Sequence, residues 1–324
     1  MCILHASGSA LAYGSAWADG ASARIVHERD ILLFDPDAHT EHLIVQVRFQ
    51  SDAKVHALIV PMPAPLADRG YAIEDEIVFF RLEAIVRYDD PSLIPDAPES
   101  EILAQSNART AQNTAMPDAS ALGNWLKLEK LMAPSSLTPW LERYTKRGWA
   151  LNAVRLADDD ATSPTRIVQS PALRFAFPAT TAVLPYTESP PEGSGTVKGH
   201  SLDVWIVAPT PVDLVQSDPK SGRMTFGDMS RRSSTRLSGA ELEAAVGRLG
   251  SFDPKSHAQW VLTRFTERSK GPRTAIDDLT VVTARPVGAP SKSDEHGHKR
   301  AWLLLVLGLV AVIGYALQSE RQRP

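Results

Sequence analysis

The sequence HERDILLFDPDAHTEHLIVQVRFQSDAKVHALIVPMPAP, residues 27–65, carries the strongest structural signal in the chain. From Leu43 to Phe49, apolar residues occupy alternate positions, which is the period of a strand with one buried face. Shorter apolar runs at 31–34 and 55–60 flank it, separated from it by an Asp-Pro-Asp turn and a Ser-Asp turn. Prolines at every second position from 61 to 65 have no backbone N–H to donate to a neighbouring strand, so strand pairing is expected to end there. The stretch predicts a three-stranded β-meander.

Strand and helix signals alternate through the rest of the chain. Further strands are expected at 149–156, 202–207, 260–265 and 279–283, and at 173–177, where Leu173, Phe175 and Phe177 share one face. Helices are expected in 71–90, in two short segments after residue 123, and from 238 to about 250. Thr138 and Gly148 suit the ends of the second short helix, and Ser238 with Glu241 forms a capping box. The fold class indicated is α+β: an antiparallel β-rich body with several short helices, plus one C-terminal transmembrane helix.

The chain closes with HKRAWLLLVLGLVAVIGYALQSERQRP, residues 298–324. No residue from Ala301 to Leu317 is charged, and seventeen residues in a helix span roughly 25 Å, near the lower limit for a bilayer core. Basic pairs flank the segment on both sides: Lys299 and Arg300 before it, Arg321 and Arg323 after it. A buried helix of a soluble domain is the alternative, but such helices seldom carry basic clusters at both ends. The segment predicts a membrane anchor that uses the lipid bilayer as its partner.

These signals divide the chain into five parts. Residues 1–26 are interpreted as the remnant of a signal peptide, since Ala16-Trp17-Ala18 has the A-x-A shape of a cleavage site. The folded domain is expected over 27–284, with a flexible insertion at 95–123 that lacks apolar periodicity. A linker at 285–300, the transmembrane helix at 301–317 and a short tail at 318–324 complete the chain.

Composition and charge exclude some functions and leave others open. The single cysteine, Cys2, excludes an internal disulfide framework and any zinc site built on cysteines. The net charge of −4 combines −10 over residues 1–126 with +6 over the remainder. The basic excess gathers in 220–273 and includes the residues Lys220, Arg231, Arg232, Arg236, Arg264, Arg268, Lys270 and Arg273. This region could contact anionic lipid, although a solvated face pairing with the acidic half is favoured. No nucleic-acid motif accompanies it.

The order of several segments resembles the bacterial DUF2330 family over most of residues 27–283. The matching pieces are HERDILLF…LIVQVRFQSDAKVHALIVPMPAP, EDEIVFFRLEAI, ASALGNWL, LTPWLERYTKRGWALNAVRL, SPALRFAFP…LPY and WVLTRFTERSKGPRTAIDDLTV. The resemblance implies an exported envelope protein, often with a C-terminal transmembrane helix, and no established activity.

Groups able to carry chemistry are few. Asp35, Asp37, His39 and His42 are the best local set of metal-capable residues, but exposed turn residues are the favoured interpretation. His296 and His298 lie in the linker, Asp158–Asp160 in a loop, and the glycine-rich segment 193–201 is followed by a strand, so none predicts a site. We therefore assign no catalytic, cofactor-binding or metal-binding residue.

Three hypotheses follow. The first is a single-pass envelope protein that serves as a binding or structural module. The second is a membrane-anchored hydrolase whose site is assembled from distant residues, for which a pocket with converging His, Asp and Ser side chains would be the sign. The third is a tail-anchored cytoplasmic adaptor. The flanking Lys and Arg count alone favours a cytoplasmic domain, whereas the A-x-A triplet and the resemblance favour export. We expect an exported domain in the bacterial cell membrane.

Overall fold

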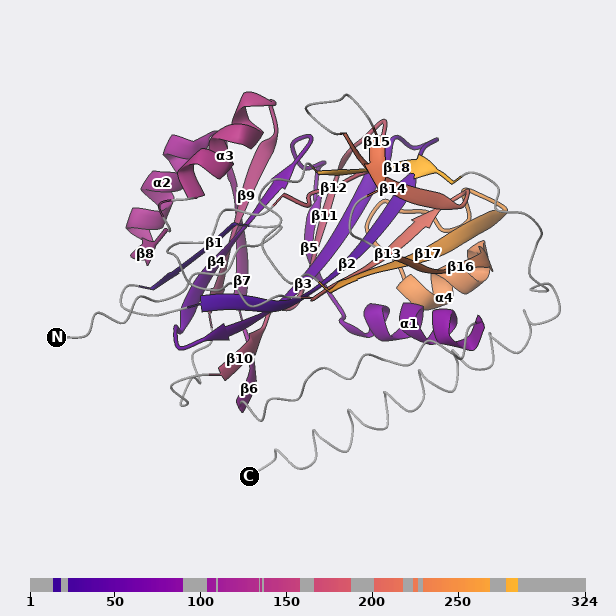
Figure 1. The fold of residues 1–324 in the computed structure, drawn as a ribbon, viewed down its shortest axis with the longest axis horizontal. Coiled ribbons are helices and arrows are strands. Elements are labelled where there is room, and N and C mark those ends of the chain that lie inside the picture. The colour runs from indigo at the N-terminus through magenta and orange to yellow at the C-terminus, as the bar shows by residue number, and fades with distance from the viewer. Residues whose placement is uncertain are drawn as a thin grey trace.

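The structure is a computed structural model. It describes residues 14–18, 23–89, 104–108, 110–133, 135, 137–157, 166–187, 201–217, 224–226, 230–268 and 278–284. This part of the chain is an α+β protein, rich in antiparallel sheet, with four short helices (Figure 1). The helices are α1 (Ile77–Asp89), α2 (Ala119–Leu128), α3 (Leu137–Lys146) and α4 (Gly239–Val246).

The strands form three sheets, which we call A, B and C. Sheet A has the order β7 (Thr110–Met116), β9 (Ala150–Ala157), β4 (Val55–Met62), β1 (Gly14–Ala18), β8 (Leu131–Met132). Sheet C has the order β12 (Val183–Leu184), β18 (Leu279–Thr283), β14 (Val212–Ser217), β15 (Met224–Phe226). All pairings in these two sheets are antiparallel.

Sheet B is the largest and branches at β3. It runs β16 (Ser230–Ser238), β17 (Gln259–Arg268), β13 (Ser201–Ala208), β2 (Ala23–Asp35), β3 (Thr40–Ser51). The C-terminal end of β3 continues to β10 (Arg166–Gln169) and β6 (Ala104–Asn107), and its N-terminal part to β11 (Ala172–Pro178) and β5 (Tyr71–Glu74). Only the β13–β2 and β10–β6 pairs are parallel in the described part of this sheet.

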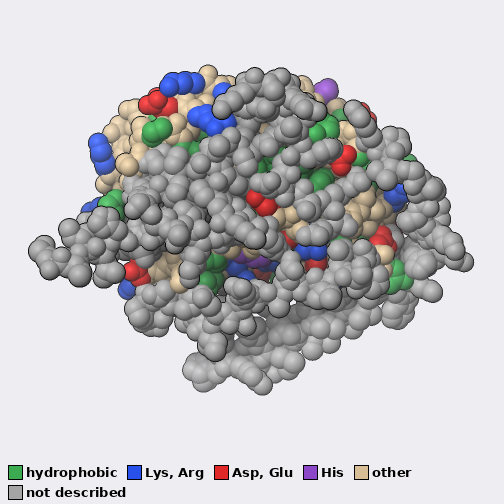
Figure 2. Space-filling view, viewed as in Figure 1, with side chains coloured by type: hydrophobic (Ala, Val, Ile, Leu, Met, Phe, Trp, Pro, Cys, Tyr) green, Lys and Arg blue, Asp and Glu red, His purple; other side chains and the backbone are tan. Residues whose placement is uncertain are grey.

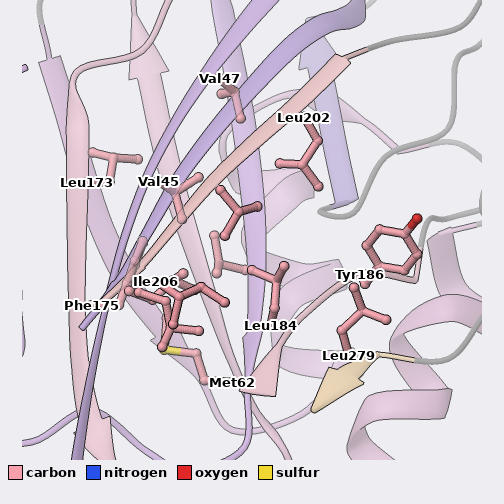
Figure 3. Close-up of a cluster of buried hydrophobic side chains, with 14 of the residues drawn as sticks. Val45, Val47, Met62, Leu173, Phe175, Leu184, Tyr186, Leu202, Ile206 and Leu279 are labelled. Atoms are coloured by element: carbon pink, nitrogen blue, oxygen red, sulfur yellow. The ribbon is translucent and has the colours of Figure 1, made fainter. Parts of the chain in front are cut away.

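Sheets A and B pack face to face across the largest hydrophobic cluster. Alternate residues of β3, from Leu43 to Phe49, point into it together with Leu58, Val60 and Met62 of β4. Sheet C closes one side of this cluster with residues such as Leu184 and Leu279, as Figure 3 shows. Leu173, Phe175 and Phe177 of β11 all face it, which confirms the alternation read from the sequence.

Helices cover the outer faces of both large sheets. A second cluster joins α1 and α4 to sheet B, and a third joins α2 and α3 to sheet A. Figure 1 shows the two helix pairs on opposite sides of the sheets. The layer order is therefore helix, sheet, sheet, helix. This layer order explains why β3 has buried apolar residues on both faces. Ile44 packs in the cluster under α1 and α4, whereas Leu43 and Val45 pack in the cluster between the sheets.

The meander expected for residues 27–65 is not formed by β2, β3 and β4. β2 and β3 pair as a hairpin, but β4 leaves sheet B and pairs with β1 and β9 in sheet A. The free edge of β3 is occupied by β10 and β11, which come more than 100 residues later. At the crossover, the ring of His56 stacks on Phe49 and its Nε2 lies 2.7 Å from Ser51 Oγ. Alternation specifies a strand's faces but not its neighbour, so this part of the expectation was wrong.

The N-terminal boundary also differs from the expectation. Residues 14–18, which include the A-x-A triplet, form β1 between β4 and β8 in sheet A, and β2 begins at Ala23. The domain therefore starts before residue 27. Because Trp17 and Ala18 pair with β8, the triplet is part of the fold in this structure and does not support a cleavage site.

The segment 95–123 contains regular structure as well. Residues 104–107 form β6, residues 110–116 form β7, and α2 starts at Ala119. β7 is the edge strand of sheet A, and among its residues only Met116 is buried. An edge strand that buries so little needs no apolar alternation, which is why no strand is predicted there from the residue pattern.

Two of the three capping signals agree with the helix ends. Thr138, expected to cap α3, lies inside that helix, because α3 begins at Leu137. Gly148 follows α3 with φ of 76°, and Ser238 and Glu241 form the expected capping box of α4, which ends at Val246. Residues 71–74, expected to be helical, instead form β5, and Asp75 accepts a hydrogen bond from the Ile77 amide at the start of α1. No helix within the described residues is long and apolar enough to cross a bilayer, and residues 301–317 lie outside them.

Candidate functional site

The turn between β2 and β3 holds the densest group of metal-capable side chains. Asp35 ends β2, and its Oδ1 accepts hydrogen bonds from the Asp37 amide at 3.0 Å and the Ala38 amide at 3.1 Å. His39 follows with φ of 50°, a left-handed conformation, and the hairpin re-enters β3 at Thr40. The sequence Asp-Pro-Asp thus builds the turn through the short Asp35 side chain.

A second segment, distant in sequence, closes over this turn. The loop before β17 brings Ser256 and His257 onto Asp35: Ser256 Oγ donates to Oδ2 at 2.8 Å, and His257 Nε2 lies 3.1 Å from Oδ1. His257 Nδ1 faces Asp37 Oδ2 at 3.8 Å. The edge of the His257 ring packs against Trp260, which is fully buried.

The Asp35 carboxylate is held in its charged form. Burial alone would raise its pKa, but hydrogen bonds from Ala38, Ser256, His257 and Asp37 together outweigh this effect and lower the pKa below its usual value. Such a carboxylate is a poor proton acceptor near neutral pH and a good electrostatic anchor. It ties the first hairpin to the loop before β17.

Asp35, Asp37 and His257 each offer one ligand atom, and these atoms lie within 4.8 Å of one another. Both Asp35 oxygens already accept hydrogen bonds, so a metal ion would have to displace Ser256 or share Asp35 with the turn amides. Asp37 is largely exposed. The hydrogen bonds explain the cluster without an ion, and we interpret it as a polar clamp.

The same residues contain Ser, His and Asp, but not in a catalytic order. A serine nucleophile needs its hydroxyl bonded to a histidine that the aspartate orients. Here the carboxylate lies between the two groups, because both Ser256 and His257 bond to Asp35. Ser256 and His257 therefore bond to different oxygens of the same carboxylate instead of forming a relay.

His42 differs from what the sequence predicted. His42 was expected to be an exposed turn residue, but it is buried in β3, with its ring edge against Phe252. Burial, with a contribution from nearby Arg174, lowers its pKa to about 4. Neither ring nitrogen has a hydrogen-bond partner in the described structure.

Glu41 points to the opposite face of β3, into the cluster between the sheets. It is completely buried, and its Oε2 accepts a hydrogen bond from the Val183 amide at 3.0 Å. Burial raises its pKa to about 8, so the carboxyl is protonated at neutral pH. Sequence reasoning missed this residue, although a glutamate at an inward position of a predicted strand was a usable signal.

The basic region 220–273 is only partly available for lipid. Arg264 lies under α1, where its Nε is 3.3 Å from Glu83 and its Nη2 3.3 Å from Asp203, and it is buried. This corrects its assignment to a basic surface. Arg236 is exposed, whereas Lys220, Lys270 and Arg273 and the side chains of Arg231, Arg232 and Arg268 lie outside the described residues.

A further buried network joins α3 to sheet C. Asp278, just before β18, accepts hydrogen bonds from Tyr144 Oη at 2.8 Å, from the Tyr186 and Thr187 amides, and from Arg147 Nη1 at 2.7 Å. Trp140 Nε1 donates to the Thr187 carbonyl at 2.8 Å. Three of the segments quoted above for the family resemblance, LTPWLERYTKRGWALNAVRL, LPY and DDLTV, meet at this carboxylate.

The remaining sequence candidates cannot be placed. His296, His298, Asp158–Asp160 and residues 193–200 lie outside the described residues.

Comparisons with known proteins add little. No family model matches the chain, so the DUF2330 resemblance stays a prediction, and no curated protein matches it either. Among solved structures, the crystal structure of baculovirus P35 matches with 9% sequence identity and a TM-score of 0.40, covering 81% of this chain and 98% of that chain. A likeness this distant carries no argument about fold or function.

Proposed function

We propose that the chain is a single-pass, membrane-anchored bacterial envelope protein whose domain serves as a binding or structural module. The observation that carries this proposal is the uncharged segment 301–317 with basic residues on both sides. The body before it has a core large enough to fold as a domain, with an apolar cluster between its sheets and another beneath each helix pair. Contact of the exposed basic residues of 220–273 with anionic headgroups is a further part of the proposal.

The domain is proposed to lie outside the cytoplasm, with residues 318–324 inside. The family resemblance supports this orientation, while the A-x-A triplet no longer does, because it lies in β1. A membrane-anchored hydrolase is the alternative, and the cluster of Asp35, Ser256 and His257 does not favour it, since the serine and the histidine both bond to Asp35. The tail-anchored cytoplasmic adaptor would have the opposite orientation, and a labelling experiment distinguishes the two.

The test uses the full chain in bacterial cells, with Cys2 replaced by serine. Cysteines are introduced separately as Ser291→Cys and Ser319→Cys, and intact cells are treated with a thiol reagent that cannot cross the membrane. We expect the chain to stay in the membrane after an alkaline wash, and only Ser291→Cys to be labelled. Labelling of Ser319→Cys alone would establish the cytoplasmic adaptor instead.

The matched control keeps the full length. Leu309→Arg together with Val310→Arg places two charges in the middle of the segment, at a cost of about 2.5–3.5 kcal/mol each on insertion scales. This variant should be released by the wash. Release of the unmodified chain under the same conditions would refute the anchor.

A further inference from the structure

Large apolar side chains are exposed at only four positions of the described structure, and two of these share one turn. Leu128 is 80% exposed and Met132 is 44% exposed, while the other two positions, Ile73 and Phe80, lie on β5 and α1. The stretch 127–132, which we call the α2–β8 turn, joins the end of α2 to the edge strand of sheet A. Isolated exposed leucines are ordinary, but a pair on one short turn needs an explanation.

The α2–β8 turn is fixed by its backbone. The Glu129 amide donates to the Trp125 carbonyl at 2.9 Å and the Lys130 amide to the Lys127 carbonyl at 3.2 Å. Lys130 has φ of 55°, a conformation that ends the helix sharply. Leu131, between the exposed residues, is buried in the cluster under α2 and α3, and Met132 pairs with Trp17 of β1. The turn therefore holds Leu128 and Met132 outward.

The charge around these two side chains is positive. Lys127 and Lys130 are both exposed. The acidic residue between them, Glu129, is already engaged by Arg155, whose Nε lies 2.9 Å from its carboxylate. Figure 2 shows Lys and Arg side chains beside apolar ones on the part of the surface where Figure 1 places α2 and α3. Ile73 and Phe80, by contrast, lie on two different elements, and the Arg29 guanidinium lies over the Phe80 ring.

We propose that the α2–β8 turn inserts Leu128 and Met132 into the interfacial layer of an anionic bilayer, with Lys127 and Lys130 bound to lipid headgroups. Apolar side chains flanked by lysines suit this layer, because the leucine and methionine side chains enter the acyl boundary while the ammonium groups stay among phosphates. The inference rests on the proposed membrane anchoring, which brings the turn close to a bilayer.

The anchor permits this contact. Residues 284–300 separate β18 from the apolar segment, and seventeen residues reach roughly 55 Å when extended. A linker of that length would let the domain turn its α2–α3 side toward the membrane. A protein partner on the same turn would not require anionic lipid, and this difference decides the test.

The experiment uses the full chain in vesicles, with Cys2 replaced by serine and an environment-sensitive dye attached to Leu128→Cys. Vesicles of phosphatidylcholine alone are compared with vesicles that also contain phosphatidylserine. We expect a blue shift and quenching by lipid-borne bromine only with the anionic lipid, and loss of both in high salt. Met132→Cys should behave in the same way, while Ala240→Cys, exposed on α4 in the opposite helix layer, should not respond.

The charge requirement is tested by adding Lys127→Glu and Lys130→Glu to the labelled chain. This pair should abolish the response while the circular dichroism spectrum stays unchanged. Flotation of the chain with vesicles separates the two proposals. A chain that does not float contradicts membrane anchoring, whereas one that floats without a dye response at 128 and 132 overturns this inference alone. An equal response in both lipids would show that the turn does not require anionic headgroups and would also overturn it.

Discussion

Two neighbouring residues of β3, Glu41 and His42, are buried on opposite faces with few polar partners. Glu41 keeps one hydrogen bond, from the Val183 amide, and His42 has none in the described structure. Burial favours the neutral form of each, which raises the pKa of the glutamate to about 8 and lowers that of the histidine to about 4. The stability of the domain should therefore respond to pH through residues that touch no solvent.

The replacement Glu41→Gln should remove one part of this response. The pKa of Glu41 is about 8 in the folded state and about 4.5 when unfolded. The folded state therefore binds the proton more tightly, and the free energy of unfolding falls as pH rises between these values, by roughly 1.4 kcal/mol per pH unit. Glutamine mimics the protonated acid, so the variant should match the unmodified chain near pH 4.5 and be more stable at pH 8.

The measurement is urea unfolding of the full chain in detergent at several pH values. Asp68→Asn, at an exposed turn position, serves as the control and should leave the pH dependence unchanged. If Glu41→Gln is no more stable than the unmodified chain at pH 8, the carboxyl is not buried as the structure has it.

At the level of residues, the sequence predicted the apolar part of the core but not its polar part. Leu173, Phe175 and Phe177 were assigned to one face from their spacing alone, and all three are buried together. Asp35 and Asp37 were considered as metal-capable residues, yet their partners Ser256 and His257 come from a segment more than 200 residues away. Spacing along one strand contains no information about such a contact.

At the level of elements, a buried carboxylate provides the charged part of the connection between α3 and sheet C. Asp278 accepts the Tyr144 hydroxyl, and Arg147 at the end of the helix bonds to the same group. Burial, reinforced by the nearby Asp278 charge, raises the pKa of Tyr144 well above its ordinary value, so the phenol remains a donor. The apolar face of α3 packs on sheet A, but this polar contact also joins it to β18.

The replacement Tyr144→Phe should test this connection. It keeps the ring contacts with Trp140 and Trp149 and removes only the hydroxyl. Because a hydrogen bond to a charged acceptor contributes about 1.5–3 kcal/mol, we expect the free energy of unfolding to fall by that amount. Lys146→Ala, which removes an exposed ion pair with Glu142 on the same helix, should change it by less than about 0.5 kcal/mol. Equal effects of the two variants would contradict the proposed role of Asp278.

The elements themselves were easier to predict than their neighbours. The capping box at Ser238 and the left-handed Gly148 follow from local backbone chemistry, which the sequence contains in full. β4 pairs in sheet A, whereas the edge of β3 is occupied by β10 and β11. The residues of β4 do not indicate which strands will pair with that edge. β7 was not predicted for a related reason: its pairing with β9, and not an alternation of apolar residues, makes it a strand.

At the level of the whole molecule, both large sheets depend on one shared apolar cluster. Phe175 of β11 in sheet B lies fully buried in it, together with Val154 and Leu156 of β9 in sheet A. The helix layers add separate clusters outside the sheets, but each of those rests on a sheet face that the shared cluster supports. The two halves of the layered structure should therefore unfold together.

The replacement Phe175→Ala tests this coupling. Removing a buried phenylalanine should lower the free energy of unfolding by about 3–5 kcal/mol, whereas Phe80→Ala, 58% exposed on α1, should cost less than about 0.5 kcal/mol. Hydrogen exchange followed by mass spectrometry reports which strands lose amide protection in the variant. Because the cluster is shared, amides of β9 in sheet A should lose protection as much as those of β13 in sheet B. Faster exchange in β13 with unchanged exchange in β9 would mean that the two sheets unfold independently, and the face-to-face packing would not be the source of the domain's stability.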